Sequence, residues 1–311
     1  MGLTHIRTPK NFVLEERLER YGAAIEQHPE TYRGRWAEAC WPLPAGTGHA
    51  TGNGSGRAVG TDADRRATGD DAHAASERAR SFSAVHLDLG CGKGAYLIER
   101  ARREPGSLFI GMDTEPICVA YAAQYICEAG LPNALVLPRS ADSLARVFAP
   151  GELAAITLNF PTPYPKRKFA TRRLVHVDHL LSYRDLLAPG ATVTLRTDSQ
   201  PLRDYALAQF EAAGYRALWT SDNVRAEHPE HPATEYERRL AAQGARVYGI
   251  CAAPAAAPSP AQVERGRNAE QSLVAYLPHD LDAMGYVPLG MEGAVINLRN
   301  RARNASRSST R

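Results

Sequence analysis

The sequence predicts an α/β protein with a mostly parallel sheet that has helices on both faces. From residue 82 onward, apolar runs of strand length alternate with stretches of helix length, which is the order that βαβ units produce. A glycine-rich turn, GCGKG (90–94), comes directly after the first run and before a predicted helix. Open α/β sheets bind ligands at the carboxyl ends of their strands. We therefore expect the functional residues at that edge of the sheet.

Five apolar runs define the predicted strands in chain order. They are VHLDL (85–89), LFIGM (108–112), ALVL (134–137), LAAITLNF (153–160) and TVTLRT (192–197). Helices are predicted at 96–103 and 116–129, between the first three runs. Two more strands are predicted at 215–220 and 246–252, with a short helix at 235–243 between them.

The composition divides the chain into five segments, of which the first two precede the sheet. Residues 1–44 mix tryptophans and tyrosines with many charges, so we expect a short helical lead-in that packs on the core. From Ala45 to Ser81 the only large apolar residue is Val59. A segment of that kind cannot bury enough apolar surface to offset the entropy of ordering it. We therefore predict a disordered, low-complexity insertion over 45–81.

The main domain is predicted to span 82–253, and two further segments follow it. Residues 254–271 are rich in proline and alanine and are predicted to form a linker. Residues 272–311 form a C-terminal extension, in which 272–298 are predicted to hold one or two strands. The last residues of this extension are rich in arginine and carry no acid.

Charge and cysteine usage limit the class of protein. The net charge is +3, so any attraction to nucleic acid must come from local clusters of cations. Five cysteines make an odd count without a C-x-x-C pair, which argues against a disulfide framework and favours a reducing, cytoplasmic location. No apolar run is long enough to span a membrane, so we expect no membrane partner. A monomer and a homodimer both remain open.

The glycine turn and two acids predict a cofactor site. Gly90, Gly92 and Gly94 allow backbone amides to approach a ligand at a helix N-terminus. The turn also satisfies the dinucleotide fingerprint, with Asp113 where a ribose-binding acid is expected; a helix N-cap is the alternative role for that acid. Asp88 precedes the turn, and its carboxylate would repel a pyrophosphate but suit an ammonium group. S-adenosylmethionine is therefore favoured over a dinucleotide or a purely structural turn.

Cysteine and histidine patterns predict no metal site. Cys91 is interpreted as a small residue that fills the tight turn, with a redox or nucleophilic role as the alternative. The pairs His176-x-x-His179 and His228-x-x-His231 have near-ligand spacing. Prolines around the second pair forbid the helix that would align it. Neither pair has a cysteine or acid partner at zinc spacing, so we expect neither to bind a metal.

The segment NFPTPYPKRKFATRR (159–173) combines a strand end with a basic cluster. No carboxylate occurs between Leu153 and Val177. A cluster of this kind predicts contacts with nucleic-acid phosphates, and a solvated surface loop is the alternative. The predicted phosphate contacts are Lys166, Arg167, Lys168, Arg172 and Arg173.

Seven motifs, taken together, resemble the bacterial tRNA (guanine-N7)-methyltransferases of TrmB type. The matching pieces are TYRGRW (31–36), DLGCGKG (88–94), FIGMD (109–113), FAPGEL (148–153), LNFPTPYPKRKFATRRLVH (158–176), TDS (197–199) and TEYE (234–237). The resemblance implies a class I S-adenosylmethionine-dependent methyltransferase with a Rossmann-like, seven-stranded sheet. It also implies methylation of N7 of the guanine at position 46, in the variable loop of tRNA.

The resemblance also implies roles for particular residues. Cofactor contacts are expected from Asp88, Gly90, Gly92, Gly94, Asp113, Ser140, Asp142 and Asn159. Catalytic roles fall to Thr162 and Asp198. Substrate contacts are expected from Lys166 and its basic neighbours, Asp198, Thr234, Glu235, Tyr236 and Glu237. The alternatives are loop capping by Asp198 and a helix capping box formed by Thr234 and Glu237, which is compatible with substrate contact by Glu235 or Tyr236.

Three departures from the family pattern leave other functions open. Thr162 stands where the family has an acid, Tyr164 replaces a tryptophan, and Ser140 stands where the family usually has Asp or Asn. A weak or silent RNA-binding paralogue and a methyltransferase for another RNA base are therefore the alternatives. Guanine N7 carries a lone pair and no proton, so methyl transfer requires alignment and desolvation but no general base. The loss of the acid is tolerable on this mechanism.

Overall fold

The computed structural model describes residues 8–38 and 82–308 of the chain. The predicted insertion at 45–81 lies outside the described residues. The N-terminal lead-in packs on the rest through helix α1 (Leu14–Arg20) and through Trp36. The indole N–H of Trp36 donates to the carbonyl of Val147 at 3.0 Å. Ile25 pairs with Val136 at the edge of the sheet, so the lead-in wraps around that edge.

A single seven-stranded sheet has the order β3-β2-β1-β4-β5-β7-β6. Strands β1 to β5 are parallel, and β7 is antiparallel to both of its neighbours. The strands are β1 (Ala84–Leu89), β2 (Ser107–Met112), β3 (Ala134–Leu137), β4 (Leu153–Asn159), β5 (Leu187–Thr197), β6 (Tyr215–Ser221) and β7 (Tyr248–Pro254). This arrangement confirms the predicted α/β class and the seven predicted strands.

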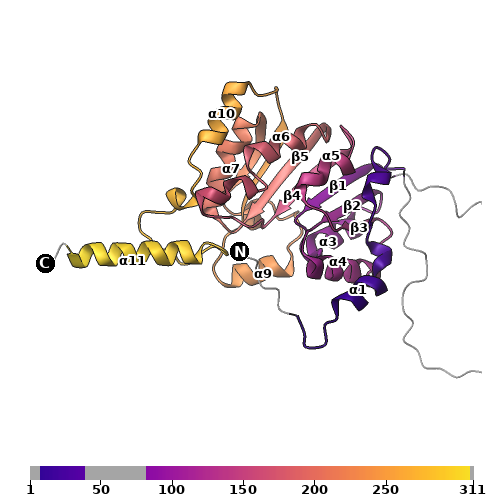
Figure 1. Ribbon diagram of the computed structural model, residues 1–311, viewed down its shortest axis with the longest axis horizontal. Coiled ribbons are helices and arrows are strands. Elements are labelled where there is room, and N and C mark those ends of the chain that lie inside the picture. Colours follow the sequence, from indigo (N-terminus) through magenta and orange to yellow (C-terminus); the bar gives the residue numbers. More distant parts are fainter. Residues whose placement is uncertain (1–7, 39–81, 309–311) are drawn as a thin grey trace, which may run out of the picture.

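Helices cover both faces of the sheet, as Figure 1 shows. On one face lie α3 (Ala95–Arg103) and α4 (Pro116–Glu128), which pack on Phe109 and Val136. On the other face lie α5 (Leu144–Val147), α6 (Val177–Arg184) and α7 (Gln200–Ala212). Side chains alternate between the faces of a strand, so Leu108 and Ile110 of β2 join the core on the second face. None of the helices in the described part of the chain is long and apolar enough to cross a membrane.

Two short helices lie between β6 and β7. They are α8 (Val224–Glu227) and α9 (Glu235–Ala242), and α9 confirms the helix predicted there. Thr234 caps α9: its hydroxyl accepts from the Glu237 N–H at 3.1 Å, and the Glu237 carboxylate accepts from the Thr234 N–H at 3.2 Å. This confirms the predicted capping box.

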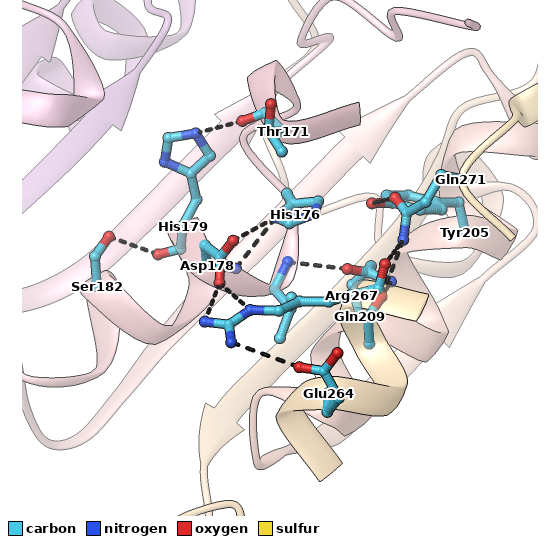
Figure 2. A network of polar contacts seen from close by, with 12 residues as sticks. Thr171, His176, Asp178, His179, Ser182, Tyr205, Gln209, Glu264, Arg267 and Gln271 are labelled. Atoms are coloured by element: carbon cyan, nitrogen blue, oxygen red, sulfur yellow. Dashed lines mark hydrogen bonds and ion pairs between the residues drawn. The ribbon is translucent and has the colours of Figure 1, made fainter. Parts of the chain in front are cut away.

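The residues predicted as a linker instead form part of the packed body. Helix α10 (Pro260–Asn268) lies so close to α7 that a Cβ on Gly266 would be 2.6 Å from the Cβ of Ala212. Figure 2 shows Arg267 of α10 facing Asp178 of α6, with an Nη2–Oδ1 distance of 2.9 Å. In the same network, the Gln209 side chain donates to the Gly266 carbonyl at 3.0 Å. The linker prediction was wrong because glycine here permits close helix packing, which composition does not reveal.

The C-terminal extension contains helix α11 (Glu292–Ser308) and a 3₁₀ turn at Leu273–Tyr276. Among its described residues there is no strand, so the predicted strands over 272–298 were wrong. The apolar residues of this segment are instead anchors: Leu273 and Met291 are fully buried in the core of the domain. Figure 1 shows α11 running away from the body toward the C-terminus.

Candidate active site

A cavity of about 430 Å³ lies at the carboxyl ends of the parallel strands. Its wall is made by the segments that follow β1, β2, β3 and β4. The chain thus brings together residues that are widely separated in sequence. Six of the predicted site residues line the cavity: Gly90, Asp113, Ser140, Asp142, Thr162 and Arg172. Four of the predicted cofactor residues therefore share the cavity with Thr162 and with Arg172 of the predicted basic loop. The other predicted cofactor residues do not line it: Asp88, Gly92, Gly94 and Asn159.

The glycine turn and Asp113 hold each other in place. The Gly92 N–H donates to Asp113 Oδ2 at 2.9 Å, and the Glu115 N–H donates to Asp113 Oδ1 at 2.9 Å. Burial raises the pKa of the Asp113 carboxyl, although these backbone donors oppose the shift. Glu115, and not Asp113, is the N-cap of α4. The carboxylate of Asp113 is therefore not used as the cap of that helix and remains at the wall of the cavity.

Gly94 has a positive φ of 76° at the start of α3. A Cβ there would also lie 3.1 Å from the Cβ of Ala122 in α4. Both the backbone conformation and the close approach of the helices explain why glycine occupies this position. These constraints fix the path of the turn, of which Gly90 lines the cavity.

The buried Asp88, two residues before the glycine turn, pairs with the half-buried Asn159 at the end of β4. The Asn159 side-chain N–H donates to Asp88 Oδ1 at 3.1 Å, and Asp88 is only 4% exposed. Burial raises the pKa of the Asp88 carboxyl to about 7, with the Asn159 hydrogen bond opposing the shift. Asn159 Oδ1 is buried and has no hydrogen-bond partner. A cationic donor would satisfy this oxygen and favour the ionised form of Asp88, so the pair fits the ammonium of S-adenosylmethionine.

Ser140 and Asp142 follow β3 and line the cavity beyond Asp113. The Ser140 carbonyl accepts from the Ser143 hydroxyl at 2.7 Å and from the Ser143 N–H at 3.0 Å. These bonds close a 3₁₀ turn at Ala141–Ser143 that carries Asp142. The exposed Asp142 thus presents a carboxylate two residues after Ser140.

The loop after β4 has a strained backbone. Phe160 and Tyr164 have positive φ angles of 49° and 45°, which bulky residues rarely adopt. Each such conformation costs on the order of 1–3 kcal/mol and is retained only where surrounding contacts enforce it. Thr162 lies between the two, is exposed and lines the cavity. The loop therefore holds Thr162 in a fixed place that local propensity would not favour.

Arg173 stabilises this strained loop and does not lie on the surface. Its side chain is fully buried. Its guanidinium donates to the carbonyls of Pro163 at 3.0 Å, Tyr164 at 2.7 Å and Gln271 at 2.7 Å. The prediction that Arg173 binds a phosphate was wrong, because the residue ties the strained loop to Gln271, the last residue of the segment that had been predicted as a linker.

The other four basic residues remain available to a partner. Arg167 to Arg172 form a 3₁₀ turn on which Lys168 and Arg172 flank the Phe169 ring at 5.0 and 4.9 Å from its centre. Lys166, Arg167, Lys168 and Arg172 are all exposed. We call these four residues the basic surface. It adjoins the cavity through Arg172.

Asp198 lies at the carboxyl end of β5, and the C-terminal extension covers it. Its Oδ2 accepts from the Tyr286 hydroxyl at 2.5 Å and from the Leu289 N–H at 3.0 Å. Burial and the hydrogen bond to Asp198 raise the pKa of the Tyr286 hydroxyl. The next residue, Gly290, packs against Pro163, since a Cβ there would lie 3.3 Å from its ring. Asp198 therefore caps a loop, as the alternative prediction held, and that loop belongs to the extension.

Glu237 does not face a substrate. Its carboxylate, only 1% exposed, is paired with the guanidinium of Arg196 and lies 3.0 Å from Arg225. The prediction of a substrate contact was wrong for Glu237, because the carboxylate pairs with the fully buried Arg196 and the partly buried Arg225 and closes the capping box with Thr234. Tyr236 meets Phe160 edge to face at 5.1 Å, and burial raises the pKa of its hydroxyl to about 12. Glu235 is the first residue of α9.

Several residues of the site were missed by sequence reasoning. Arg139 and His179 line the cavity, and Arg139 is held by Glu30, with an Nε–Oε1 distance of 3.5 Å. The position of Arg139 directly after β3 was a usable signal. Tyr286 and Leu289 carry no such signal, because only the path of the extension brings them to Asp198.

Cys91 fills the tight turn, as predicted. A Cβ on Gly111 would lie 2.8 Å from the Sγ of Cys91, so the thiol occupies the space that the missing side chain of Gly111 leaves. Burial raises the pKa of the Cys91 thiol well above its ordinary value, which disfavours a thiolate nucleophile. His176 and His179 have separate partners in Figure 2: His176 caps α6, and His179 contacts the Thr171 carbonyl at 3.1 Å.

Comparison with known proteins agrees with this geometry. A family model described as "Putative methyltransferase" matches residues 83–250. The tRNA (guanine-N(7)-)-methyltransferase of Geobacillus thermodenitrificans is 34% identical over 165 residues, which cover 53% of this chain and 76% of the relative. The enzyme of the same name from Streptococcus suis is 32% identical over 169 residues, or 53% of this chain and 79% of the relative.

Solved structures with lower similarity include an antibiotic-related methyltransferase, at 21% identity and a TM-score of 0.44 over 55% of this chain and 88% of the other. Another is the 16S rRNA methyltransferase KamB, at 19% identity and a TM-score of 0.44 over 63% of this chain and 97% of the other. The family model matches the part of the chain that forms the cavity and nearly all of the sheet, and the curated relatives are more than 30% identical over more than two thirds of their own length. This chain therefore belongs to the tRNA (guanine-N7)-methyltransferase family of S-adenosylmethionine-dependent enzymes.

Proposed function

We propose that this protein methylates N7 of guanine in tRNA with S-adenosylmethionine as the methyl donor. The observation that carries the proposal is a single cavity lined both by cofactor-type residues, such as Asp113, and by Arg172 of the basic surface. A methyltransferase for RNA needs both chemistries side by side. The names of the relatives support the choice of tRNA and of guanine N7. A cytoplasmic location goes with this substrate.

The cofactor residues have separable roles in this proposal. Asp88 and the unpartnered Asn159 Oδ1 hold the ammonium group, and Asp113 accepts from the ribose hydroxyls. Ser140 and Asp142 line the far wall. When bound, S-adenosylmethionine supplies a methyl carbon attached to a positively charged sulfur. The chain's own residues bind the donor, orient the base and exclude water.

The base needs an acceptor but no general base. Guanine N7 has a lone pair and no proton, whereas its N1 and N2 atoms carry protons that a carboxylate can accept. Asp198 is the candidate acceptor, because it lies at the end of β5, beside the loop that carries Thr162. Its Oδ2 is already bonded to Tyr286 and Leu289, which leaves Oδ1 for the base. Thr162 then supplies a neutral contact in place of the family acid.

The extension positions Asp198 in this scheme. Two donors on one oxygen restrain rotation of the carboxylate, so its free oxygen points in one direction. Tyr236, which lies against Phe160, forms a wall near the same acid. The basic surface contacts the phosphates of the tRNA, with the guanine at position 46 of the variable loop as the target.

Methyl transfer to an unmodified tRNA transcript tests the proposal. Purified full-length protein is incubated with the transcript and isotopically labelled donor, and the nucleosides are analysed by mass spectrometry. We expect labelled 7-methylguanosine with wild-type transcript and none when guanine 46 is replaced by adenine. Binding of donor and tRNA without any transfer would instead support a silent paralogue. Label on a different base atom would identify a methyltransferase of another specificity.

A further inference from the structure

The turn between α8 and α9 gathers two imidazoles and a carboxylate around one point. The ligand atoms of His228, Glu230 and His231 all lie within 4.8 Å of one another. His228 Nδ1 lies 3.3 Å from Glu230 Oε1, and His231 Nε2 lies 3.7 Å from the same oxygen. A zinc ion about 2.0–2.2 Å from each ligand separates tetrahedral ligands by roughly 3.4 Å. The observed separations are thus close to those of ligands that share one ion.

We propose that His228, Glu230 and His231 form a binding site for a divalent transition metal, with Zn²⁺ as the best match. Two imidazoles and one carboxylate are a common three-ligand set for zinc. The absence of a helix had argued against this pair of histidines. A helix is not required, because the His231 N–H donates to the His228 carbonyl at 3.2 Å and closes a turn. The turn brings the two rings to the same side as the intervening glutamate.

Contacts with β6, α8 and α3 hold the turn that carries His228, Glu230 and His231 in place. The His228 ring stacks on Trp219 of β6, with ring centres 4.1 Å apart. Arg225 donates to the His231 carbonyl at 2.9 Å, and Arg103 of α3 donates to the Glu230 carbonyl at 3.3 Å. These contacts fix both the backbone and one ligand ring before any ion binds. A pre-organised ligand set binds a metal with less loss of conformational entropy.

The ligand types also suit a metal. His228 and His231 offer ring nitrogens and Glu230 offers a carboxylate, and Zn²⁺ binds both kinds of ligand. Three arginines around the site have carboxylate partners outside it. Arg103 pairs with Glu99, and Arg225 and Arg196 share Glu237. One carboxylate and two ring nitrogens therefore converge without a cation already paired among them.

An ion at this site would stabilise the approach to α9. His231 lies three residues before Thr234, which caps the helix that carries Tyr236. His231 also lines a groove of about 670 Å³ between α3, α4 and this turn, away from the cavity of the candidate active site. The metal would stabilise the turn that precedes α9, the helix that carries Tyr236 near the candidate base acceptor. It has no part in methyl transfer itself.

Zinc titration of the full-length, tag-free protein tests the site. After treatment with a chelator, wild-type protein is titrated with Zn²⁺ by calorimetry and with Co²⁺ by visible absorption. We expect one high-affinity equivalent, and affinity at least about tenfold lower in H228Q and in H231Q, since even the loss of an outer hydrogen-bond partner costs 10- to 100-fold. The matched control is H279Q, which removes an exposed histidine far along the chain and should leave the affinity unchanged.

Thermal unfolding provides a second measurement. At one Zn²⁺ concentration, the Tm of wild type and of H279Q should rise by more than that of H228Q and H231Q, because stabilisation by a ligand of the folded state grows with its affinity. The proposal is overturned if wild type binds no zinc equivalent more tightly than H231Q. It is also overturned if cobalt produces a thiolate charge-transfer band, which would assign the ion to cysteines. A variant is taken as correctly folded when its Tm without metal matches that of wild type.

Discussion

Removal of a single hydroxyl, in the variant Y286F, tests whether the extension positions the candidate base acceptor. The variant keeps the ring and deletes only the donor that lies 2.5 Å from Asp198 Oδ2. Hydrogen bonds to charged groups contribute roughly 1.5–3 kcal/mol. If that energy is expressed wholly in orientation of the acid for the transition state, kcat/KM falls about 10- to 150-fold. The Leu289 N–H, at 3.0 Å, remains on the same oxygen and favours the lower end of that range.

The assay is single-turnover methyl transfer to an unmodified transcript, with donor affinity measured separately by calorimetry. Donor affinity should not change in Y286F, because Asp198 takes no part in the proposed donor contacts. The matched control is Y276F in the same extension, whose hydroxyl donates to the Glu270 carbonyl at 3.2 Å and is remote from Asp198. It should leave kcat/KM unchanged.

The opposite result would refute the reasoning. If Y286F raises kcat/KM, the extension competes with the base for Asp198 and acts as a cover that the substrate must displace. If Y286F has no effect while Asp198→Asn is inactive, the acid is positioned by other contacts. If Asp198→Asn retains full activity, Asp198 is not the base acceptor.

The remaining predictions concern the donor, the loop and the turn. Burial raises the pKa of Asp88 to about 7, so the ionised form that binds an ammonium is scarce at pH 6 and dominant at pH 8. The affinity for the methyl donor, measured by calorimetry, should therefore rise about tenfold from pH 6 to pH 8. In D88N the affinity should not depend on pH in this range. The same raised pKa means that ionisation of Asp88 destabilises the folded state. The free energy of unfolding of the donor-free protein should therefore fall as the pH rises from about 4 to about 7, and it should fall less in D88N. R173M removes the donor from three carbonyls and should lower the free energy of unfolding in urea by at least about 2 kcal/mol. The control R172A, on the exposed basic surface, should change that free energy by less than about 0.5 kcal/mol. R172A should instead reduce the slope of log tRNA affinity against log salt by about 0.7–0.9, and an unchanged slope would remove that residue from the phosphate contacts. Gly94→Ala should cost about 1–2 kcal/mol of stability from its left-handed backbone alone, measured by thermal unfolding.

The strands, the glycine turn and α9 were predictable because their signals are local. An apolar run of strand length, a capping box or a glycine that needs positive φ is visible within a few residues. Because β1 to β5 are parallel, their carboxyl ends lie at one edge of the sheet, which brings Asp113, Ser140 and Thr162 together. Residues at these strand ends could therefore be named as site candidates before the structure was known.

The failures share a different cause. Composition could not reveal that Gly266 permits α10 to pack on α7, or that Arg173 points inward to three carbonyls. The basic cluster looks uniform in sequence, yet one of its five cations is structural. Glu237 was equally ambiguous, since an acid in a capping box can also face a ligand. Its burial against Arg196 and Arg225 settles the matter in three dimensions.

By itself, the sequence determined the α/β sheet, the cofactor turn and the basic surface beside it. The tertiary structure alone decided that Tyr286 holds Asp198 across 88 positions of the chain, and that a turn gathers His228, Glu230 and His231. The physical reason is that backbone conformation is governed largely by near neighbours, whereas the partner of a buried charge or hydrogen-bond donor is chosen by whichever distant segment the folded chain brings against it.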